Sequence, residues 1–241
     1  MTDEPRRRRR TAQKPRRSQK AGRGALRTPL RTAKGRTTSS AKWLERQLND
    51  PYVAAAKEAG YRSRAAFKLA QIDDKFSILR PGGCVVDLGA APGGWSQVAV
   101  ERTGPKGHVI ALDIEAIDPI PNVEVIAADI LDPGTIDIIA KRLNRPATAI
   151  LSDMAAPSTG HRQTDHLRVI ALCEAALAVA VGLLSPGGAF VAKVLRGGTE
   201  QSLLLQLKRR FNAVRHFKPP TSRSDSAEIY VVATGFRGNS S

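Results

Sequence analysis

The sequence has little cysteine, few aromatic side chains and no long apolar run, and each scarcity excludes a class of protein. Two cysteines in 241 residues exclude a disulfide framework, and no zinc-binding spacing is present, so no metal site is expected. Cys84 lies in a predicted buried strand and Cys173 on the apolar side of a predicted helix, as core residues of a reducing compartment do. Without an apolar run of 18 residues or a secretory signal, no membrane partner is expected.

Acidic residues are scarce at the N-terminus. Residues 1–40 contain 14 Lys and Arg against Asp3 and Glu4, whereas the rest of the chain contains 24 basic and 20 acidic residues. Segments such as Arg6–Arg10 repel themselves and lack apolar partners, so we predict a disordered basic tail over residues 1–38 and one folded domain over 39–241. The composition favours a nucleic-acid partner over an anionic membrane or a merely solubilising tail.

An Arg-rich, acid-poor N-terminus is also typical of mitochondrial transit peptides. The first 24 residues contain no Leu, Ile, Val or Phe, so they do not predict the amphipathic helix of such a peptide. The cytoplasm is therefore the favoured location.

From Pro81 onward, short apolar runs alternate with helical stretches. The predicted strands are 84–88, 108–112, 123–127, 147–151, 189–194, 213–217 and 229–233, and the predicted helices lie near 94–102, 134–143, 165–184 and 199–210. This alternation predicts an α/β fold with a mostly parallel seven-stranded sheet, helices on both faces, and ligands at the carboxyl ends of the strands. The last two strands have no helix between them, so they can pair antiparallel. Shorter helices are expected near 42–48, 51–59 and 63–76. The last has Ser63 as its N-cap and places Phe67, Ala70 and Gln71 on one face, with Lys68 beside it.

A glycine-rich turn over residues 85–96 joins a buried strand to a helix and is the densest functional signal. Gly89 opens the turn, where the absence of a side chain lets a ligand approach the backbone. Asp113 and Asp129 end the next two strands, where carboxylates can accept hydrogen bonds from a ribose and an adenine amine. Pro92 does not fit the turn that cradles a pyrophosphate, so a nucleoside cofactor without phosphates is favoured over a dinucleotide. The alternative is an ordinary tight turn.

Five separated motifs then occur in one order, together covering about residues 40–236. They are 61–69, 87–97, 152–155, 186–194 and 222–235. The set resembles the FtsJ/RrmJ family of 2′-O-ribose RNA methyltransferases, and most of all its bacterial member that methylates a uridine of 23S rRNA. The resemblance implies a Rossmann-like fold with an antiparallel last strand, and S-adenosylmethionine as methyl donor. It also implies rRNA or the large ribosomal subunit as the substrate.

The family has a Lys-Asp-Lys-Glu tetrad, and the resemblance places it on Lys68, Asp153, Lys193 and Glu228. Lys193 also stands out unaided, because it interrupts a strand that should be buried, where an uncompensated ammonium is costly. We predict that Lys193 is the general base and that a nearby Lys68 disfavours its protonated form.

The remaining predicted site residues fall into two groups. We place the cofactor against Gly89, Pro92, Gly93, Trp95, Asp113, Asp129 and Asp153. Basic residues that flank the strand ends are predicted to grip RNA phosphates, with solvated surface charge as the alternative for each; they are Arg62, Arg64, Arg168, Arg196, Lys218 and Arg223.

Two loops depart from the family pattern. Residues 156–160 carry their proline one position late and lack an asparagine, and 195–198 replace an aromatic-Gln-Gly run, so RNA docking can differ in detail. A tRNA or mRNA-cap methyltransferase is one alternative, and an RNA-binding assembly factor that retains the fold is another. The complete tetrad argues against the second. A monomer is expected.

Overall fold

The computed structural model describes residues 44–45, 48–157, 159–196 and 201–238. The predicted basic tail, 1–38, and most of the helix predicted near 42–48 lie outside the described residues. The chain divides into a short unit, Met1–Asp50, and a large unit, Pro51–Ser241. All the residues discussed below belong to the large unit.

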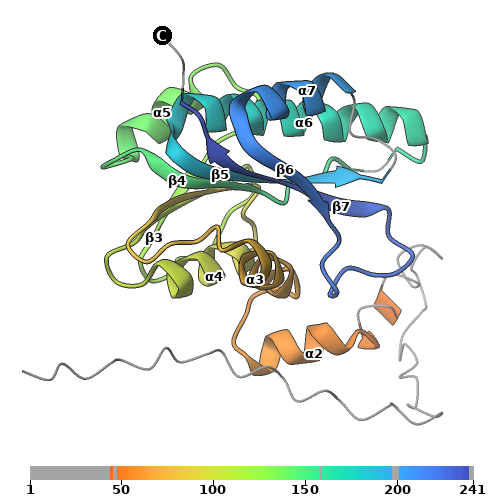
Figure 1. The fold of residues 1–241 in the computed structure, drawn as a ribbon. Coiled ribbons are helices and arrows are strands. Elements are labelled where there is room, and N and C mark those ends of the chain that lie inside the picture. The colour runs from red at the N-terminus through yellow and green to blue at the C-terminus, as the bar shows by residue number, and fades with distance from the viewer. Residues whose placement is uncertain (1–43, 46–47, 158, 197–200, 239–241) are drawn as a thin grey trace, which may run out of the picture. The chain divides into compact units, whose positions relative to one another are not determined.

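A seven-stranded sheet forms the centre of the large unit, in the order β3-β2-β1-β4-β5-β7-β6 (Figure 1). The strands are β1 Cys84–Leu88, β2 His108–Asp113, β3 Val123–Ala127, β4 Ala147–Ser152, β5 Leu184–Leu195, β6 Phe211–Phe217 and β7 Glu228–Phe236. β1 pairs parallel with β2 and β4, β2 with β3, and β4 with β5. β7 pairs antiparallel with both β5 and β6, which confirms the predicted sheet and its antiparallel last strand.

Helices cover both faces of this sheet. They are α2 Pro51–Glu58, α3 Ala65–Phe76, α4 Gly94–Thr103, α5 Thr135–Arg142, α6 Arg162–Leu183 and α7 Gln201–Arg210. α3 and α4 lie on one face, and α5, α6 and α7 lie on the other (Figure 1). All five residues of β1 are buried, as expected for a parallel strand that is covered on both sides.

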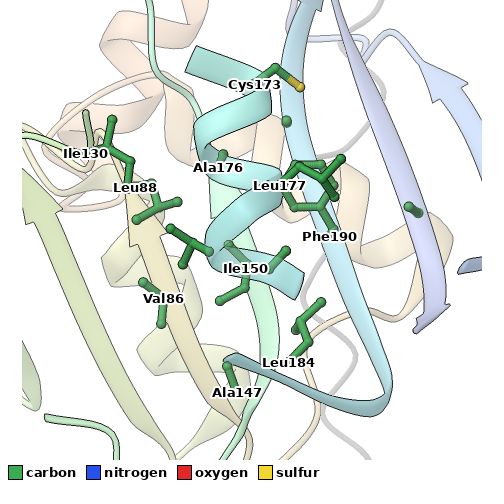
Figure 2. Packing of buried hydrophobic residues seen from close by; sticks show 14 of the residues in the cluster. Val86, Leu88, Ile130, Ala147, Ile150, Cys173, Ala176, Leu177, Leu184 and Phe190 are labelled. Atoms are coloured by element: carbon green, nitrogen blue, oxygen red, sulfur yellow. The ribbon is translucent and has the colours of Figure 1, made fainter. Parts of the chain in front are cut away.

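Each face of the sheet has its own hydrophobic core. On the α6 face, Cys173 and Leu177 pack against Ile150 of β4 and Phe190 of β5 (Figure 2). By length and composition, residues Gln163–Leu183 of α6 could cross a membrane. Their apolar character has a simpler origin, because one side of the helix packs on the sheet.

The core of the opposite face contains Leu69 and Ile72 of α3, Trp95 of α4 and Tyr230 of β7, all buried. In this core α3 packs against α4, and α4 packs against β1 and β2. Cys84 and Cys173 are buried free thiols, as predicted.

Two details of α3 differ from the sequence prediction. The helix begins at Ala65 with Arg64, not Ser63, as its N-cap. The Ser63 hydroxyl faces α4, where it lies 2.5 Å from the position that a Cβ on Gly94 would occupy. The buried positions are Ala66, Leu69, Ile72 and Asp73, one residue out of phase with the expected face. Phe67 instead packs against the rings of Tyr52 and Tyr61 on the outer side of the helix.

Candidate active site

A cavity of about 330 Å³ opens at the carboxyl ends of β1 to β4, within the size range of small-ligand pockets. Four predicted site residues line it, namely Gly89, Asp113, Asp129 and Asp153. Apolar side chains complete the walls, and they include Leu112, Ile130, Met154 and Leu172. The cavity thus offers an apolar slot with carboxylates at several points of its rim.

Asp113 shapes the cavity as well as lining it. Its two carboxylate oxygens accept the backbone amides of Ala91 and Glu115, at 2.8 and 2.9 Å. These bonds tie the glycine turn after β1 to the end of β2. A carboxylate has about four acceptor positions, so both oxygens can still accept hydroxyl groups from a ligand.

Gly89 is required where the turn leaves β1. Its φ is +71°, a conformation that side chains disfavour, and a Cβ at this position would collide with the side chain of Met154. A glycine here therefore keeps the floor of the cavity open.

Three of the predicted cofactor residues, Pro92, Gly93 and Trp95, do not line this cavity. The indole of Trp95 is buried, donates its Nε1 hydrogen to the carbonyl of Ala65 at 2.8 Å, and lies 5.6 Å from the ring of Tyr230. Its side chain therefore positions α3 and Tyr230, and a cofactor contact by Trp95 stays a prediction. The backbone amides at the start of α4 can contact a cofactor, because the first amides of a helix have no hydrogen-bond partner within the helix.

Arg62 occupies the outer side of the same turn. Its guanidinium donates to the carbonyl of Pro92 at 3.2 Å, to that of Asp118 at 2.6 Å and to that of Pro119 at 2.7 Å. Its backbone amide donates to the side chain of Gln97 at 2.8 Å. Arg62 therefore joins two loops that continue from the cavity walls, and the phosphate contact predicted for it stays a prediction.

The four tetrad residues come from four elements and meet at the same edge of the sheet. Lys68 lies on α3, Asp153 follows β4, Lys193 lies in β5, and Glu228 begins β7. Lys193 Nζ lies 3.1 Å from Asp153 Oδ1 and donates to the Asp153 carbonyl at 2.6 Å. Lys68 Nζ lies 3.3 Å from Glu228 Oε2. The geometry thus assembles the predicted set.

Tyr230 links the two ion pairs and was not predicted as a site residue. Its hydroxyl accepts a hydrogen bond from Lys68 at 3.1 Å and donates one to Asp153 Oδ1 at 2.6 Å. Tyr230 pairs with Lys193 across β5 and β7. A signal for it existed in the sequence, since Tyr230 stands two residues after Glu228 and therefore on the same face of the strand.

The electrostatics of the site centre on the Asp153 carboxylate. Burial acts to raise its pKa, but the charges of Lys193 and Lys68 and the Tyr230 hydrogen bond outweigh burial and lower it below the ordinary value. Burial and the neighbouring Asp153 carboxylate raise the pKa of Tyr230 well above 10. Asp153 is therefore a fixed anion, and Tyr230 a neutral hydrogen-bond donor, at neutral pH.

Asp87 is a second residue beside the site, after Tyr230, that was not predicted as a site residue. It lies on β1, fully buried, and its Oδ2 accepts the hydroxyl of Ser96 at 2.7 Å. Its Oδ1 has no hydrogen-bond partner within the described residues. Burial is the largest influence on its pKa, the Ser96 bond opposes it, and the carboxylates of Asp153 and Asp113 add to it, so the pKa rises to about 7.

Several predicted RNA-gripping side chains have partners within the protein. Arg64 donates to the carbonyl of Thr221, Arg168 donates to that of Pro157 at 3.4 Å, and Lys218 donates to that of Ser226 at 2.7 Å. The side chain of Arg196 is exposed and that of Arg223 is half-buried. Phosphate binding by these residues stays a prediction.

Gln71 of α3 accepts the backbone amide of Thr221 at 2.9 Å, next to the Arg64 contact. Helix α3 therefore holds the loop that leads into Glu228, which fixes Glu228 opposite Lys68.

Across the described part of the chain, no group of three or more His, Cys, Asp or Glu side chains is placed to hold a metal ion.

Comparison with known proteins gives a consistent result. A sequence model of the FtsJ-like methyltransferase family matches residues 61–236. A Parvibaculum lavamentivorans protein named ribosomal RNA large subunit methyltransferase E is 56% identical over 91% of this chain and 90% of its own length. A Paramagnetospirillum magneticum protein of the same name is 58% identical over 89% of this chain and 90% of its own.

Among solved structures, a Plasmodium falciparum protein described as a ribosomal RNA methyltransferase has a similar fold. It is 33% identical, with a TM-score of 0.66, and the match covers 74% of this chain and all of that one. The family match, over residues 61–236, spans the sheet and the site residues described above.

Proposed function

Because this chain belongs to the FtsJ-like methyltransferase family, we propose that it transfers a methyl group from S-adenosylmethionine to a ribose 2′-hydroxyl of large-subunit ribosomal RNA. The methyl acceptor inferred from the sequence resemblance is a uridine. The reaction belongs to ribosome maturation and, in a bacterial cell, to the cytoplasm. The enzyme acts as a monomer.

The residues of the cavity fit this donor. The apolar slot between Leu112, Ile130 and Leu172 suits an adenine ring, and the carboxylates of Asp113 and Asp129 in its lining can accept hydrogen bonds from ribose hydroxyls and an adenine amine. Gly89 leaves room that a side chain would fill. When bound, S-adenosylmethionine supplies an electrophilic methyl group on a positively charged sulfur.

The observation that carries the proposal is the position of Asp153. This residue lines the donor cavity and is also in direct contact with Lys193, so the donor site and the tetrad share a wall. An acceptor hydroxyl placed above Lys193 therefore lies beside the donor cavity, as an in-line transfer requires.

A ribose hydroxyl is a weak nucleophile and must lose its proton as it reacts. Lys193 has an amine that can accept that proton, and its side chain is only 8% exposed. The second amine, on Lys68, lies in the same hydrogen-bonded cluster and adds positive charge beside the site. Positive charge beside the reacting oxygen stabilises that oxygen as its proton leaves.

Asp153, Tyr230 and Glu228 hold these amines in place. Asp153 orients Lys193 through two contacts, and Tyr230 transmits the position of Asp153 to Lys68. Glu228 is more exposed than the other members, with 35% of its side chain accessible, and it can contact the incoming ribose as well as Lys68. The set is complete, which favours an active enzyme over an assembly factor that only binds RNA.

The proposal is tested with large ribosomal subunits from cells that lack this protein, incubated with the purified enzyme and methyl-labelled S-adenosylmethionine. The label is expected on a ribose 2′-oxygen of the large-subunit rRNA, mapped by its resistance to alkaline hydrolysis. Label on a base, or transfer to tRNA but not to the subunit, contradicts the proposal. The same reaction with Asp153→Asn serves as the control for a site-dependent product.

A further inference from the structure

The edge of the sheet opposite the tetrad is rich in basic residues, and the acidic side chains of Asp73 and Glu124 there are paired with Arg102, and with His108 and Arg142. Five segments lie at the starts of β1, β2, β4, β5 and β6. A sixth follows the end of β7, which runs in the opposite direction, so all six segments lie at this edge. They are residues 78–83, 104–108, 144–148, 184–188, 208–212 and 235–238, and we call them the strand-start band. The band contains no Asp or Glu. Its Lys and Arg residues are Arg80, Lys106, Arg145, Lys208, Arg209, Arg210 and Arg237.

The first half of the band is joined by direct contacts. Arg145 donates to the carbonyl of Gly82 at 2.7 Å and to that of Lys106 at 3.0 Å, and Arg80 donates to that of Gly187 at 3.2 Å. These bonds link the starts of β1, β2, β4 and β5.

The second half of the band begins beside Pro186, the residue before Gly187. Gly238 lies beside Pro186, with 3.7 Å between a Cβ built on Gly238 and the proline ring. Next to it, Arg237 donates to the carbonyls of Arg209 and Lys208, at 2.9 and 3.4 Å. The band is therefore a continuous surface across most of the sheet.

The charges of the band face solvent. All of its Lys and Arg side chains are exposed except that of Arg210, which is half-buried. The arginines that contact carbonyls keep their positive charge, because a carbonyl does not neutralise it. Lys106 and Lys208 have no side-chain hydrogen bond or ion pair among the described residues.

The catalytic edge is different in kind. Asp113, Asp129, Asp132, Asp153 and Glu228 lie there, at or just beyond the opposite ends of the strands. Basic side chains such as Arg62 and Arg168 also lie at the catalytic edge, so the band differs from it in containing no acidic residue. A positive surface without acidic residues is suited to a phosphate backbone.

We infer that the strand-start band is a second RNA-contact face, which binds the backbone of an rRNA element distant from the nucleotide that is methylated. The inference rests on the proposed function, since it takes rRNA as the polyanion. Strands of five or six residues separate the two edges, so the second element lies roughly 15–20 Å or more from the reacting ribose. A short hairpin that fills the active site does not reach the band, whereas folded large-subunit rRNA does.

The test compares Lys106→Gln/Lys208→Gln with a control, Lys57→Gln/Arg215→Gln, which removes two exposed charges from α2 and the middle of β6. Affinity is measured as a function of salt for protein-free large-subunit rRNA, and for a short hairpin that carries the mapped methylation site. Steady-state kinetics are measured on the large subunit. Cofactor affinity and thermal unfolding report on the fold.

For the band variant, the affinity for the full-length rRNA is expected to fall about threefold to tenfold per charge at 0.1 M salt, and the salt slope to fall by about two. The KM for the subunit rises while kcat is unchanged, and hairpin binding, cofactor affinity and the control variant stay near wild type.

Equal losses for the hairpin and the full-length rRNA, or no loss for either, overturn the inference. A loss on the subunit but not on protein-free rRNA also overturns it, because the partner would then be a ribosomal protein. Failure of the proposed function is a separate result, seen as a wild-type enzyme that binds rRNA but transfers no methyl group to it.

Discussion

Asp87 gives a prediction in which the structure sets both the sign and the size of the effect. The carboxyl is fully buried under the glycine turn, and only its Oδ2 has a hydrogen-bond partner. Its pKa rises from 3.8 to about 7, chiefly through burial. Replacement by Asn keeps the shape and an oxygen that accepts the Ser96 hydroxyl, but removes the titration.

The sign follows from proton linkage. The folded protein binds a proton at Asp87 up to about pH 7, whereas the unfolded chain releases it near pH 4. The stabilisation is thus fully present below about pH 4 and is lost as the pH rises through 7. A shift of about three units corresponds to at most about 4 kcal/mol of unfolding free energy.

The assay is denaturant unfolding of wild type and Asp87→Asn at several values between pH 4 and pH 8. As the pH rises from 4 to 8, the unfolding free energy of wild type is expected to fall relative to that of the variant, by up to about 4 kcal/mol. Comparing the two proteins cancels other titrating groups. Parallel stability curves would mean that Asp87 stays ionised in the folded protein, which would refute the reasoning.

Three further predictions concern the site and the tail. Tyr230→Phe removes a hydroxyl that forms hydrogen bonds with Lys68 and Asp153, so the free energy of unfolding should fall by roughly 1–3 kcal/mol. The kcat should also fall, with little change in cofactor affinity measured by calorimetry; a normal kcat would mean that Tyr230 does not support the tetrad. Arg62→Gln should weaken cofactor binding severalfold with an unchanged RNA salt slope, because it ties the cavity loops together; the reverse pattern would identify a phosphate contact. Deleting residues 1–38 should leave cofactor affinity unchanged and reduce the salt slope of rRNA binding, and an unchanged slope would mean that the tail does not touch phosphate.

Local patterns were sufficient to predict the fold. The apolar runs that became β1 and β4 are buried on both faces, and the absence of a helix between the last two strands correctly indicated antiparallel pairing of β6 and β7. The glycine turn and the acids at strand ends, Asp113 and Asp129, were predictable for the same reason, since the carboxyl ends of parallel strands meet at one edge.

Contacts between distant segments were not predictable in this way. Tyr230 meets Lys68 across 162 positions of sequence, and no periodicity encodes that meeting. The place of Trp95 in the turn did not reveal that the packing of α4 on α3 directs its indole into the core. The basic character of Arg62 predicted a phosphate contact, but the sequence did not reveal that its guanidinium joins three carbonyls of neighbouring loops.

The central claim, that Lys193 removes the proton from the ribose hydroxyl, is tested most directly by single-turnover methyl transfer with Lys193→Arg at saturating rRNA and cofactor. Arginine preserves the positive charge beside Asp153 but stays protonated, so it cannot act as a base. The rate is expected to fall about 10²–10⁴-fold, close to the rate of Lys193→Ala, with cofactor affinity near wild type. A near-normal rate for the arginine variant would contradict the account and leave position 193 with a purely electrostatic role.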